Sequence, residues 1–332
     1  MRLAYLLPHP ELSGGNKVAF QHAALLAARG HRVTVLAEGP RPAWADFAGP
    51  YVDLAAGEPP GTGQDLVIAT YWTTVERAGR LALGPLAHFC QGYEGGLDHL
   101  LARREEIEAV YRRRLPTLAV APHLVEFLAR RFGRESRLAP PPVDPVFRPA
   151  LRRAPRRRPW IAVPGIYAAE VKGVATALAA IGLLRQEGFP CRLLRFATHP
   201  LSPEEAAVLT PDRYLDAVPA AALAAALRRC DLLLFPSLAG EGFGLPLLEA
   251  LATKVPVVAS EIPSARYIAG GAAVLVPPGD ARAFATAAAA LLGDPQRWRE
   301  ARERGQRAAQ RFAPARVATL LEGTLEWARA HA

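Results

Sequence analysis

Several residue types are scarce in this chain of 332 residues. Cysteine occurs only at Cys90, Cys191 and Cys230, and no two cysteines form a Cys-x-x-Cys pair. This odd, widely spaced set argues against disulfides and zinc, and favours buried thiols in a reducing compartment. No apolar run reaches the roughly 20 residues that a membrane-spanning helix needs, and the chain begins with a strand-like segment. We therefore expect a cytoplasmic protein, at most peripheral at the inner face of a membrane.

The chain also lacks the residue spacings that are typical of metal sites. The eight histidines show no metal-binding spacing, and no Asp-x-Asp pair occurs. An enzyme that holds a diphosphate through a metal ion would need such groups, so we predict a metal-independent protein without a cofactor. Lysine is confined to Lys17, Lys172 and Lys254, and asparagine to Asn16. Three of these four residues fall in loops that are candidates for a site.

The charge of +9 is unevenly distributed along the chain. Residues 151–160 hold five arginines and no acidic residue, whereas the segments on either side are nearly neutral. A short basic run that contains proline is typical of a solvated linker, so we expect no nucleic-acid partner. Contact of this run with phosphate or anionic lipid is the alternative.

Apolar segments alternate between strand-like and helix-like spacing on both sides of this run. We predict strands at 2–7, 32–37, 65–70, 85–90, 117–121, 161–164, 191–196 and 231–235, and helices at 16–29, 103–114, 122–132, 173–187, 281–292, 295–311 and 314–331. Such alternation predicts α/β domains with parallel sheets. The predicted domains are residues 1–150 and 161–312, joined by the linker 151–160 and followed by a terminal helix at 313–332.

One segment carries most of the functional information. Glu241 and Glu249 lie eight positions apart around a glycine-rich turn, between the apolar strand 231–235 and an apolar helix that begins near Pro246. The start of a helix presents free N–H groups and a partial positive charge, which favour phosphate and sugar oxygens. Ionised carboxylates accept hydrogen bonds from sugar hydroxyls. The alternative is a helix-capping acid with a nearby surface acid.

This Glu-x7-Glu segment, in the setting Phe-Pro-Ser then Glu-Gly-Phe-Gly-Leu-Pro then Glu-Ala, resembles retaining GT-B glycosyltransferases of family 4. Further matches lie at Gly14-Gly15, Val143-Asp144, Lys172-Gly173 and Val255–Ser260. The resemblance implies two Rossmann-like domains across a cleft, with the last helix crossing back to the first domain. The absence of an Asp-x-Asp pair and of metal-binding histidine spacing argues against a metal-dependent GT-A transferase. An expected function follows: transfer of a hexose or deoxyhexose, with retention, from a nucleotide-diphosphate sugar, in bacterial polysaccharide or glycoconjugate assembly.

The resemblance also implies roles for individual residues. Glu241 would lie by the donor sugar, Glu249 would bind ribose, and Lys172 would stabilise the leaving diphosphate as charge builds on it. The remaining donor-binding candidates are Gly14, Gly15, Val218, Gly242, Phe243, Gly244 and Leu245. The family usually has an arginine about six residues before the lysine, and residues 165–170 contain none. Either Lys172 acts alone, an arginine arrives from elsewhere, or the diphosphate is stabilised less.

Acceptor-side candidates lie in the first domain. Gln91 and Glu94 follow a strand end, where α/β proteins bind ligands. Gln91 stands where many relatives have histidine, and would hold the donor sugar or its leaving oxygen as a catalytic group. Glu94 would orient an acceptor hydroxyl, and Asn16 would contact the acceptor. Ordinary loop chemistry is the alternative for Gly14, Gly15 and Glu94.

Three other functions remain open. A nucleotide-sugar epimerase would share the fold without transfer. An NAD-dependent dehydrogenase also opens with a β-α-β unit, but this chain lacks Gly-x-Gly-x-x-Gly after its first strand. A non-catalytic nucleotide- or glycan-binding protein is the third. The expected partners are a nucleotide-sugar donor and a glycan, lipid-linked or small-molecule acceptor; the sequence indicates no oligomeric state.

Overall fold

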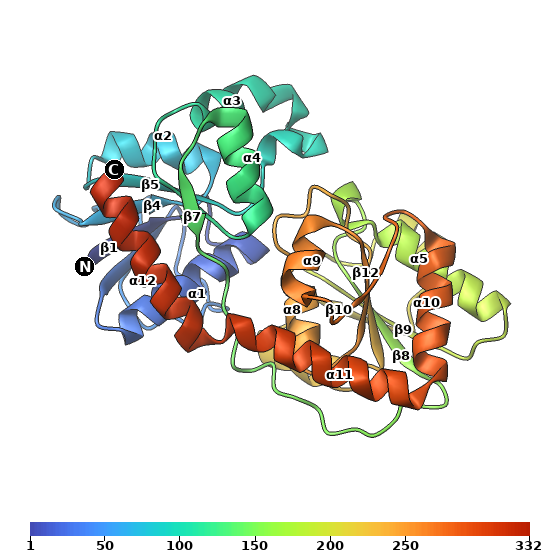
Figure 1. The fold of residues 1–332 in the computed structure, drawn as a ribbon. Helices are drawn as coiled ribbons and strands as arrows, with labels where there is room; N and C mark the ends of the chain where they lie inside the picture. The colour runs from blue at the N-terminus through green and yellow to red at the C-terminus, as the bar shows by residue number, and fades with distance from the viewer. The chain divides into compact units, whose positions relative to one another are not determined.

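A computed structural model describes residues 1–332 and divides them into two compact units. The first unit combines Met1–Pro142 with Phe312–Ala332, and the second unit is Val143–Arg311. Each unit contains one fully parallel sheet with helices packed on it (Figure 1). No helix in the chain is long and apolar enough to cross a membrane.

The first unit has a seven-stranded sheet in the order β3-β2-β1-β4-β5-β6-β7. Its strands are β1 (Arg2–Leu6), β2 (Arg32–Ala37), β3 (Tyr51–Asp53), β4 (Leu66–Ala69), β5 (Leu86–Cys90), β6 (Thr117–Ala119) and β7 (Ser136–Leu138). Its helices are α1 (Gly14–Ala28), α2 (Trp72–Leu81), α3 (Arg104–Tyr111), α4 (Pro122–Phe132) and α12 (Pro314–His331), with 3-10 turns at Glu94–Gly96 and Asp98–Arg103. The strand order reverses direction between β1 and β4.

The predicted terminal helix is confirmed as α12, and it packs on the first unit. The Thr324 hydroxyl donates to the Leu138 carbonyl at the end of β7, at 2.7 Å. Glu322 accepts from Arg29 at 2.9 Å and lies 3.2 Å from the imidazole of His31, both just after α1. These contacts fix the last helix along α1.

The second unit has a six-stranded sheet in the order β10-β9-β8-β11-β12-β13. Its strands are β8 (Trp160–Pro164), β9 (Arg192–Ala197), β10 (Arg213–Asp216), β11 (Leu232–Phe235), β12 (Val257–Ser260) and β13 (Val274–Val276). Its helices are α5 (Val174–Gln186), α6 (Pro203–Val208), α7 (Ala220–Leu227), α8 (Leu245–Ala252), α9 (Pro263–Ala269), α10 (Ala281–Gly293) and α11 (Pro295–Ala309), with 3-10 turns at Glu170–Lys172 and Gln310–Phe312. The order reverses between β8 and β11.

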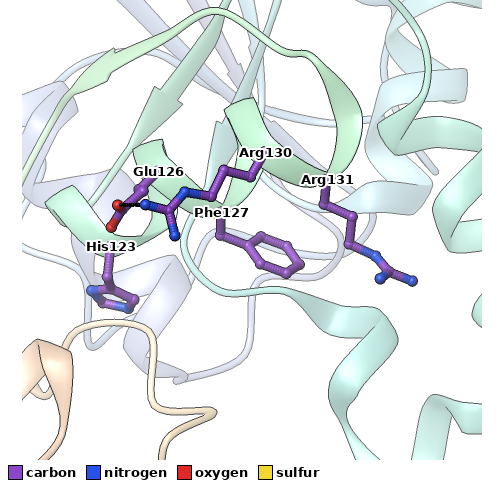
Figure 2. A pocket seen from close by; sticks show the side chains of 5 residues that line it. All are labelled: His123, Glu126, Phe127, Arg130 and Arg131. Carbon is purple, nitrogen blue, oxygen red and sulfur yellow. Dashed lines mark hydrogen bonds and ion pairs between the residues drawn. The ribbon is translucent and has the colours of Figure 1, made fainter.

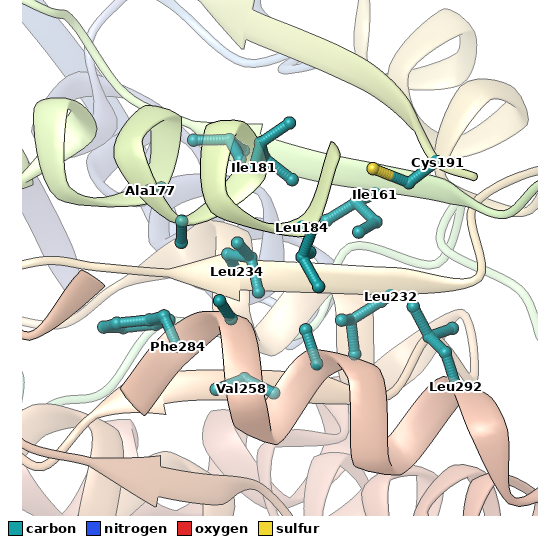
Figure 3. Packing of buried hydrophobic residues seen from close by; sticks show 14 of the residues in the cluster. Ile161, Ala177, Ile181, Leu184, Cys191, Leu232, Leu234, Val258, Phe284 and Leu292 are labelled. Carbon is teal, nitrogen blue, oxygen red and sulfur yellow. The ribbon is translucent and has the colours of Figure 1, made fainter. Parts of the chain in front are cut away.

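The core of the second unit explains why β11 reads as one continuous apolar run. Leu232 and Leu234 are fully buried between α5 and α10, where Ile181 and Phe284 pack against them (Figure 3). The remaining residues of β11 are also buried. A strand covered on both faces of a parallel sheet has no solvent-facing positions, so apolar residues occupy all of it.

The basic run 151–160 differs from the solvated linker that the sequence predicts. Asp231 is fully buried at the start of β11, and its carboxylate accepts from the guanidinium groups of Arg152 and Arg156. The backbone N–H of Trp160 donates to the same carboxylate at 2.8 Å. These ion pairs hold the run against the second unit, which extends from Val143 to Arg311.

Candidate functional site

The second unit gathers its candidate site residues at the reversal point of its sheet. The loop after β8 carries Lys172, and the loop after β11 carries Glu241. Strands β8 and β11 are neighbours, and both loops leave the carboxyl edge of the sheet. Ligands of open α/β sheets bind at this edge, where the strand order reverses.

The two loops are joined by an ion pair. Lys172 Nζ lies 2.8 Å from Glu241 Oε2, and the Ser237 hydroxyl donates to the same oxygen at 2.9 Å. The Glu241 side chain is only 9% exposed, whereas that of Lys172 is 35% exposed. An ammonium group has three donors, so Lys172 keeps hydrogen-bonding capacity for a ligand while Glu241 holds it in place.

Two glycines allow this close approach of the loops. Gly173 has a φ of 58°, and a Cβ atom there would lie 2.1 Å from the carbonyl oxygen of Pro236. Gly244 has a φ of 106° and caps helix α8, and a Cβ atom there would lie 2.7 Å from the ring of Phe235. Only glycine meets both the backbone conformation and the spacing at these points.

Helix α8 presents its first turn to this loop. The helix begins at Leu245 with Pro246 in its first turn, as the sequence predicts, and Gly242, Phe243 and Gly244 lead into it as buried residues. The Phe243 ring packs edge-on against Tyr267 at 6.3 Å between centroids. The first N–H groups of a helix have no acceptor within the helix, so the loop offers them to an anion.

Glu249 lies one turn further along α8 and is 6% exposed. It therefore shares the helix whose start adjoins Glu241. Val218 follows the edge strand β10 and is half-buried. Three strand spacings separate β10 from β11, which is about 14 Å along the same carboxyl edge. The predicted nucleotide contacts at Glu249 and Val218 stay predictions.

Arg195 and Ser237 are supporting residues that sequence reasoning missed. Arg195 is fully buried in β9, pairs with Glu205 at 2.5 Å, and donates to the carbonyls of Val163 at 2.6 Å and Gly165 at 2.7 Å. It therefore fixes the start of the loop that leads to Lys172. Because its guanidinium is occupied by these contacts, Arg195 acts by positioning and does not take the place of the diphosphate-binding arginine absent from 165–170. The sequence feature that could have identified Arg195 is an arginine inside an otherwise apolar predicted strand.

The first unit brings three predicted residues together at its own reversal point. Gly14 and Gly15 form the first turn of α1, two residues earlier than the predicted helix start. Gln91, directly after β5, donates from Nε2 to the Gly15 carbonyl at 3.1 Å, while its buried Oε1 atom has no partner. The Gln91 side chain thus links the loop after β5 to the start of α1, and one oxygen is available to a donor group.

Asn16 is buried and holds the loop before α1. Its amide donates to the carbonyl of His9 at 2.8 Å and of Glu11 at 2.9 Å. The Ser13 hydroxyl accepts from the Asn16 backbone N–H at 3.1 Å and caps the helix. The amide donors of Asn16 are thus engaged within its own loop. The predicted contact of Asn16 with the acceptor stays a prediction.

Glu94 lies in a buried polar cluster behind Gln91. It is 7% exposed, and the hydroxyl of Tyr111 forms a hydrogen bond with its carboxylate. Burial raises the pKa of Glu94 to about 7, which the Tyr111 hydrogen bond only partly offsets. The carboxyl group therefore exchanges its proton near neutral pH, although its predicted role towards an acceptor stays a prediction.

Glu94→Gln is expected to remove a pH dependence of stability. The pKa of Glu94 is higher in the folded state than its ordinary value of 4.5, so ionisation disfavours folding. Below pH 4.5 Glu94 is protonated in both the folded and the unfolded state, so it does not lower the free energy of unfolding. As pH rises from about 4.5 to 7, the free energy of unfolding falls by up to about 3 kcal/mol, and the variant should lack this loss. Urea unfolding at pH 5 and pH 8 measures it.

Glu126→Gln is the matched control, because Glu126 is exposed and pairs only with Arg130 on α4. If Glu94→Gln raised the free energy of unfolding equally at pH 5 and pH 8, the raised pKa assigned to Glu94 would be contradicted.

A hollow of about 400 Å³ lies along α4 in the first unit. His123, Glu126, Phe127, Arg130 and Arg131 line it, with Glu126 and Arg130 joined by an ion pair (Figure 2). Arg131 turns instead to Glu108, 2.6 Å away on α3. The hollow begins near the carboxyl edge of β6 and is lined by none of the predicted site residues.

Not all basic residues of the first unit face solvent. Arg134 is buried, and it contacts the ring nitrogen of His88 at 2.8 Å and the carbonyl of Val110 at 3.1 Å.

The three cysteines are free and buried. No three His, Cys, Asp or Glu side chains come together as a metal-ligand cluster.

Residues 158–294 match the family model of glycosyl transferases group 1. The match includes Lys172 and the whole Glu241–Glu249 segment. These residues form a group 1 glycosyltransferase domain. The resemblance to glycosyltransferase family 4 that the Glu-x7-Glu segment predicts is thus confirmed, and the predicted GT-B architecture of two parallel-sheet domains with a long terminal helix is confirmed as well.

Part of the chain is similar to a curated relative. Over 82 residues it is 44% identical to phosphatidyl-myo-inositol mannosyltransferase of Mycobacterium leprae (strain TN). The similar segment covers 24% of this chain and 22% of that relative, so it spans less than a quarter of the relative's length.

Solved structures resemble this chain over nearly its full length. Sucrose-phosphate synthase from Thermosynechococcus elongatus has a TM-score of 0.81 at 19% identity, with 99% of each chain covered. Anabaena HepE in complex with UDP-glucose has a TM-score of 0.78 at 15% identity, with 98% of this chain and 99% of that chain covered. At these identities the likeness concerns the fold.

Proposed function

We propose that the protein is a retaining, metal-independent glycosyltransferase. It moves a hexose or deoxyhexose from a nucleotide-diphosphate sugar to an acceptor hydroxyl on a glycan, a lipid-linked molecule or a small molecule, in bacterial polysaccharide or glycoconjugate assembly. The observation that carries the proposal is the 2.8 Å pair of Lys172 and Glu241 at the reversal point of a group 1 domain. The UDP-glucose complex of the structurally similar Anabaena protein supports a nucleotide-sugar donor.

The donor end of the reaction follows from the second unit. Lys172 and the first turn of α8 place positive charge where a diphosphate gains negative charge as its bond to the sugar breaks. Glu241 accepts hydrogen bonds from sugar hydroxyls while it holds Lys172, and Glu249 accepts from ribose. The contacts with the diphosphate strengthen in the transition state, so they act on the rate of transfer more than on donor affinity, whereas the ribose contact of Glu249 acts on donor affinity.

Transfer then proceeds on one face of the sugar. The bond from the anomeric carbon to the diphosphate oxygen breaks, the acceptor oxygen bonds to the same face, and the acceptor proton passes to the leaving phosphate. No enzyme nucleophile is needed for this path. In this proposal Gln91, whose Oε1 has no partner, holds the donor sugar, and Glu94 orients the acceptor hydroxyl. A product of inverted configuration at the anomeric carbon would contradict it.

Thermal unfolding with nucleotides tests the donor site. UDP, dTDP, GDP, ADP and NAD are compared at equal concentration on the wild type and on Glu249→Ala. A bound nucleotide at about 100 times its Kd should stabilise the protein by about 2.7 kcal/mol. Loss of a charged hydrogen-bond acceptor for ribose should weaken binding about 10- to 100-fold, which removes between about half and most of the shift. Glu187→Ala is the control, because Glu187 forms only an exposed pair with Arg282.

Each alternative function predicts a different outcome. Stabilisation by one nucleoside diphosphate that Glu249→Ala loses and Glu187→Ala retains supports the transferase and identifies the nucleotide of its donor. Stabilisation by NAD alone would favour a dehydrogenase. No stabilisation by any nucleotide of the series would favour a protein without nucleotide chemistry. Donor turnover in the absence of an acceptor would favour the epimerase.

A further inference from the structure

A second cavity, of about 500 Å³, lies in the second unit between the basic run 151–160 and helix α11. Six arginines line it: Arg152, Arg153, Arg299, Arg302, Arg304 and Arg307. Only two acidic side chains, Glu300 and Glu303, share the lining. The wall is therefore strongly positive.

Two of the arginines are held rigidly at the base of the cavity. Arg302 is 3% exposed, donates to the Lys254 carbonyl at 2.7 Å and to the Ala150 carbonyl, and stacks on Trp298 with its guanidinium carbon 4.4 Å from the ring centroid. Arg152 lies over the same ring at 5.4 Å. Burial, with the nearby charge of Arg152, lowers the pKa of Arg302 to about 10, so the Arg302 guanidinium remains cationic at neutral pH.

The acidic groups around the cavity are already paired. Glu303 accepts from Lys254 Nζ at 2.8 Å, and Glu300 lies 3.7 Å from Arg304. Asp231, beneath Arg152, is shared by Arg152 and Arg156. Positive charge thus exceeds negative charge here even after every nearby carboxylate is counted.

The remaining arginines project from the rim. Arg153, Arg299, Arg304 and Arg307 are exposed, and Arg299 donates to the Arg153 carbonyl at 3.1 Å across the two walls. Exposed guanidinium groups from two segments can close on a ligand as planar, two-pronged donors. The oxygens of one phosphate accept two parallel hydrogen bonds from one guanidinium group. Several guanidinium groups can therefore bind two adjoining phosphates.

We propose that this cavity binds a compact, multiply charged phosphate group, with a diphosphate as the simplest case. Its volume falls within the range of small-molecule sites. It is distinct from the donor site, because Asp231 precedes β11 whereas Ser237 and Glu241 follow it. The four residues of β11 separate the two ends by about 13 Å.

Calorimetric titration with inorganic pyrophosphate tests the proposal on the full chain. Lys172→Ala serves as the parent protein, so that the donor site lacks its lysine contact with phosphate. We expect binding that Arg304→Ala/Arg307→Ala weakens about tenfold or more, since each lost guanidinium removes a charge-assisted hydrogen bond. Both residues are exposed, so the fold should persist. The matched control is Arg297→Ala/Arg316→Ala, two exposed arginines outside the cavity.

Retained affinity in the control together with loss in the cavity variant supports the site. Three outcomes would overturn it: no binding to the Lys172→Ala protein, equal weakening by both double variants, or no weakening by the cavity variant. Sedimentation with phosphatidylcholine vesicles that contain phosphatidic acid distinguishes a lipid headgroup from a free ligand. Binding to these vesicles without binding of pyrophosphate would also overturn the proposal.

Discussion

Lys172→Ala is expected to lower the turnover number of sugar transfer about 100- to 1,000-fold, with a smaller change in the KM for the donor. The ammonium of Lys172 is fixed 2.8 Å from Glu241 beside the first turn of α8. In that place it meets a diphosphate whose negative charge grows as the sugar leaves, so its loss raises the barrier more than it weakens donor binding. Steady-state kinetics with the donor identified by the nucleotide series measures both constants.

Lys254→Ala is the control, because Lys254 is the other lysine of the second unit and pairs only with the exposed Glu303. Its turnover number should stay close to that of the wild type. A fall of equal size in both variants, or a Lys172→Ala effect confined to KM, would show that Lys172 does not stabilise the leaving group.

Glu241→Gln adds a test of the ion pair itself. If Glu241 acts partly by holding Lys172, the double variant Glu241→Gln/Lys172→Ala loses less than the product of the two single losses. Independent roles would give multiplied losses. The cycle separates the direct contact of Glu241 with the sugar from its hold on Lys172.

The regular elements follow closely from local sequence signals. Helix α4 was predicted at 122–132 and occupies Pro122–Phe132, since Pro122 suits its first turn and Gly133 ends it in a left-handed conformation. Strand β2 agrees equally well at Arg32–Ala37. Where a proline, a glycine or an unbroken apolar run marks the boundary of an element, that boundary can be predicted without knowledge of the tertiary structure.

Elements without such marks escaped prediction. Strand β10, Arg213–Asp216, lies at the sheet edge with one buried residue, so its sequence has no apolar run. Helix α2, Trp72–Leu81, begins with β-branched threonines, and Thr74 caps it by bonding to the backbone of Tyr71. Neither feature belongs to the usual signals, and both elements depend on the neighbours against which they pack.

The candidate site shows the same division. The Glu-x7-Glu spacing and Lys172 are visible in the sequence because Glu241 and Lys172 lie in loops that contain glycine, and because lysine is rare in this chain. Ser237 and Arg195 are less visible. Ser237 meets Glu241 four residues on through the shape of the folded loop, and Arg195 reaches the carbonyls of Val163 and Gly165 from the neighbouring strand. Residues that support a site through packing need the fold before they can be assigned.

Asp231→Ala is expected to cost about 3–5 kcal/mol of the free energy of unfolding. The Asp231 carboxylate is fully buried and accepts from the side chains of Arg152 and Arg156, and from the backbone N–H groups of Arg156 at 3.0 Å and Trp160 at 2.8 Å. Its removal leaves guanidinium charge and two amide donors without their acceptor. Residues 151–159 should then be held less firmly against the second unit.

Urea unfolding, with Glu187→Ala as the control, measures this cost. The exposed pair of Glu187 and Arg282 should contribute less than about 1 kcal/mol, because solvent screens it. Asp231→Asn keeps the shape and one oxygen that can accept from the backbone, so it should lose less than Asp231→Ala. A cost for Asp231→Ala no larger than that of the exposed control would mean that the basic run is held by its backbone and by Trp298 instead. In that case the arginines of the second cavity would owe their placement to packing rather than to charge.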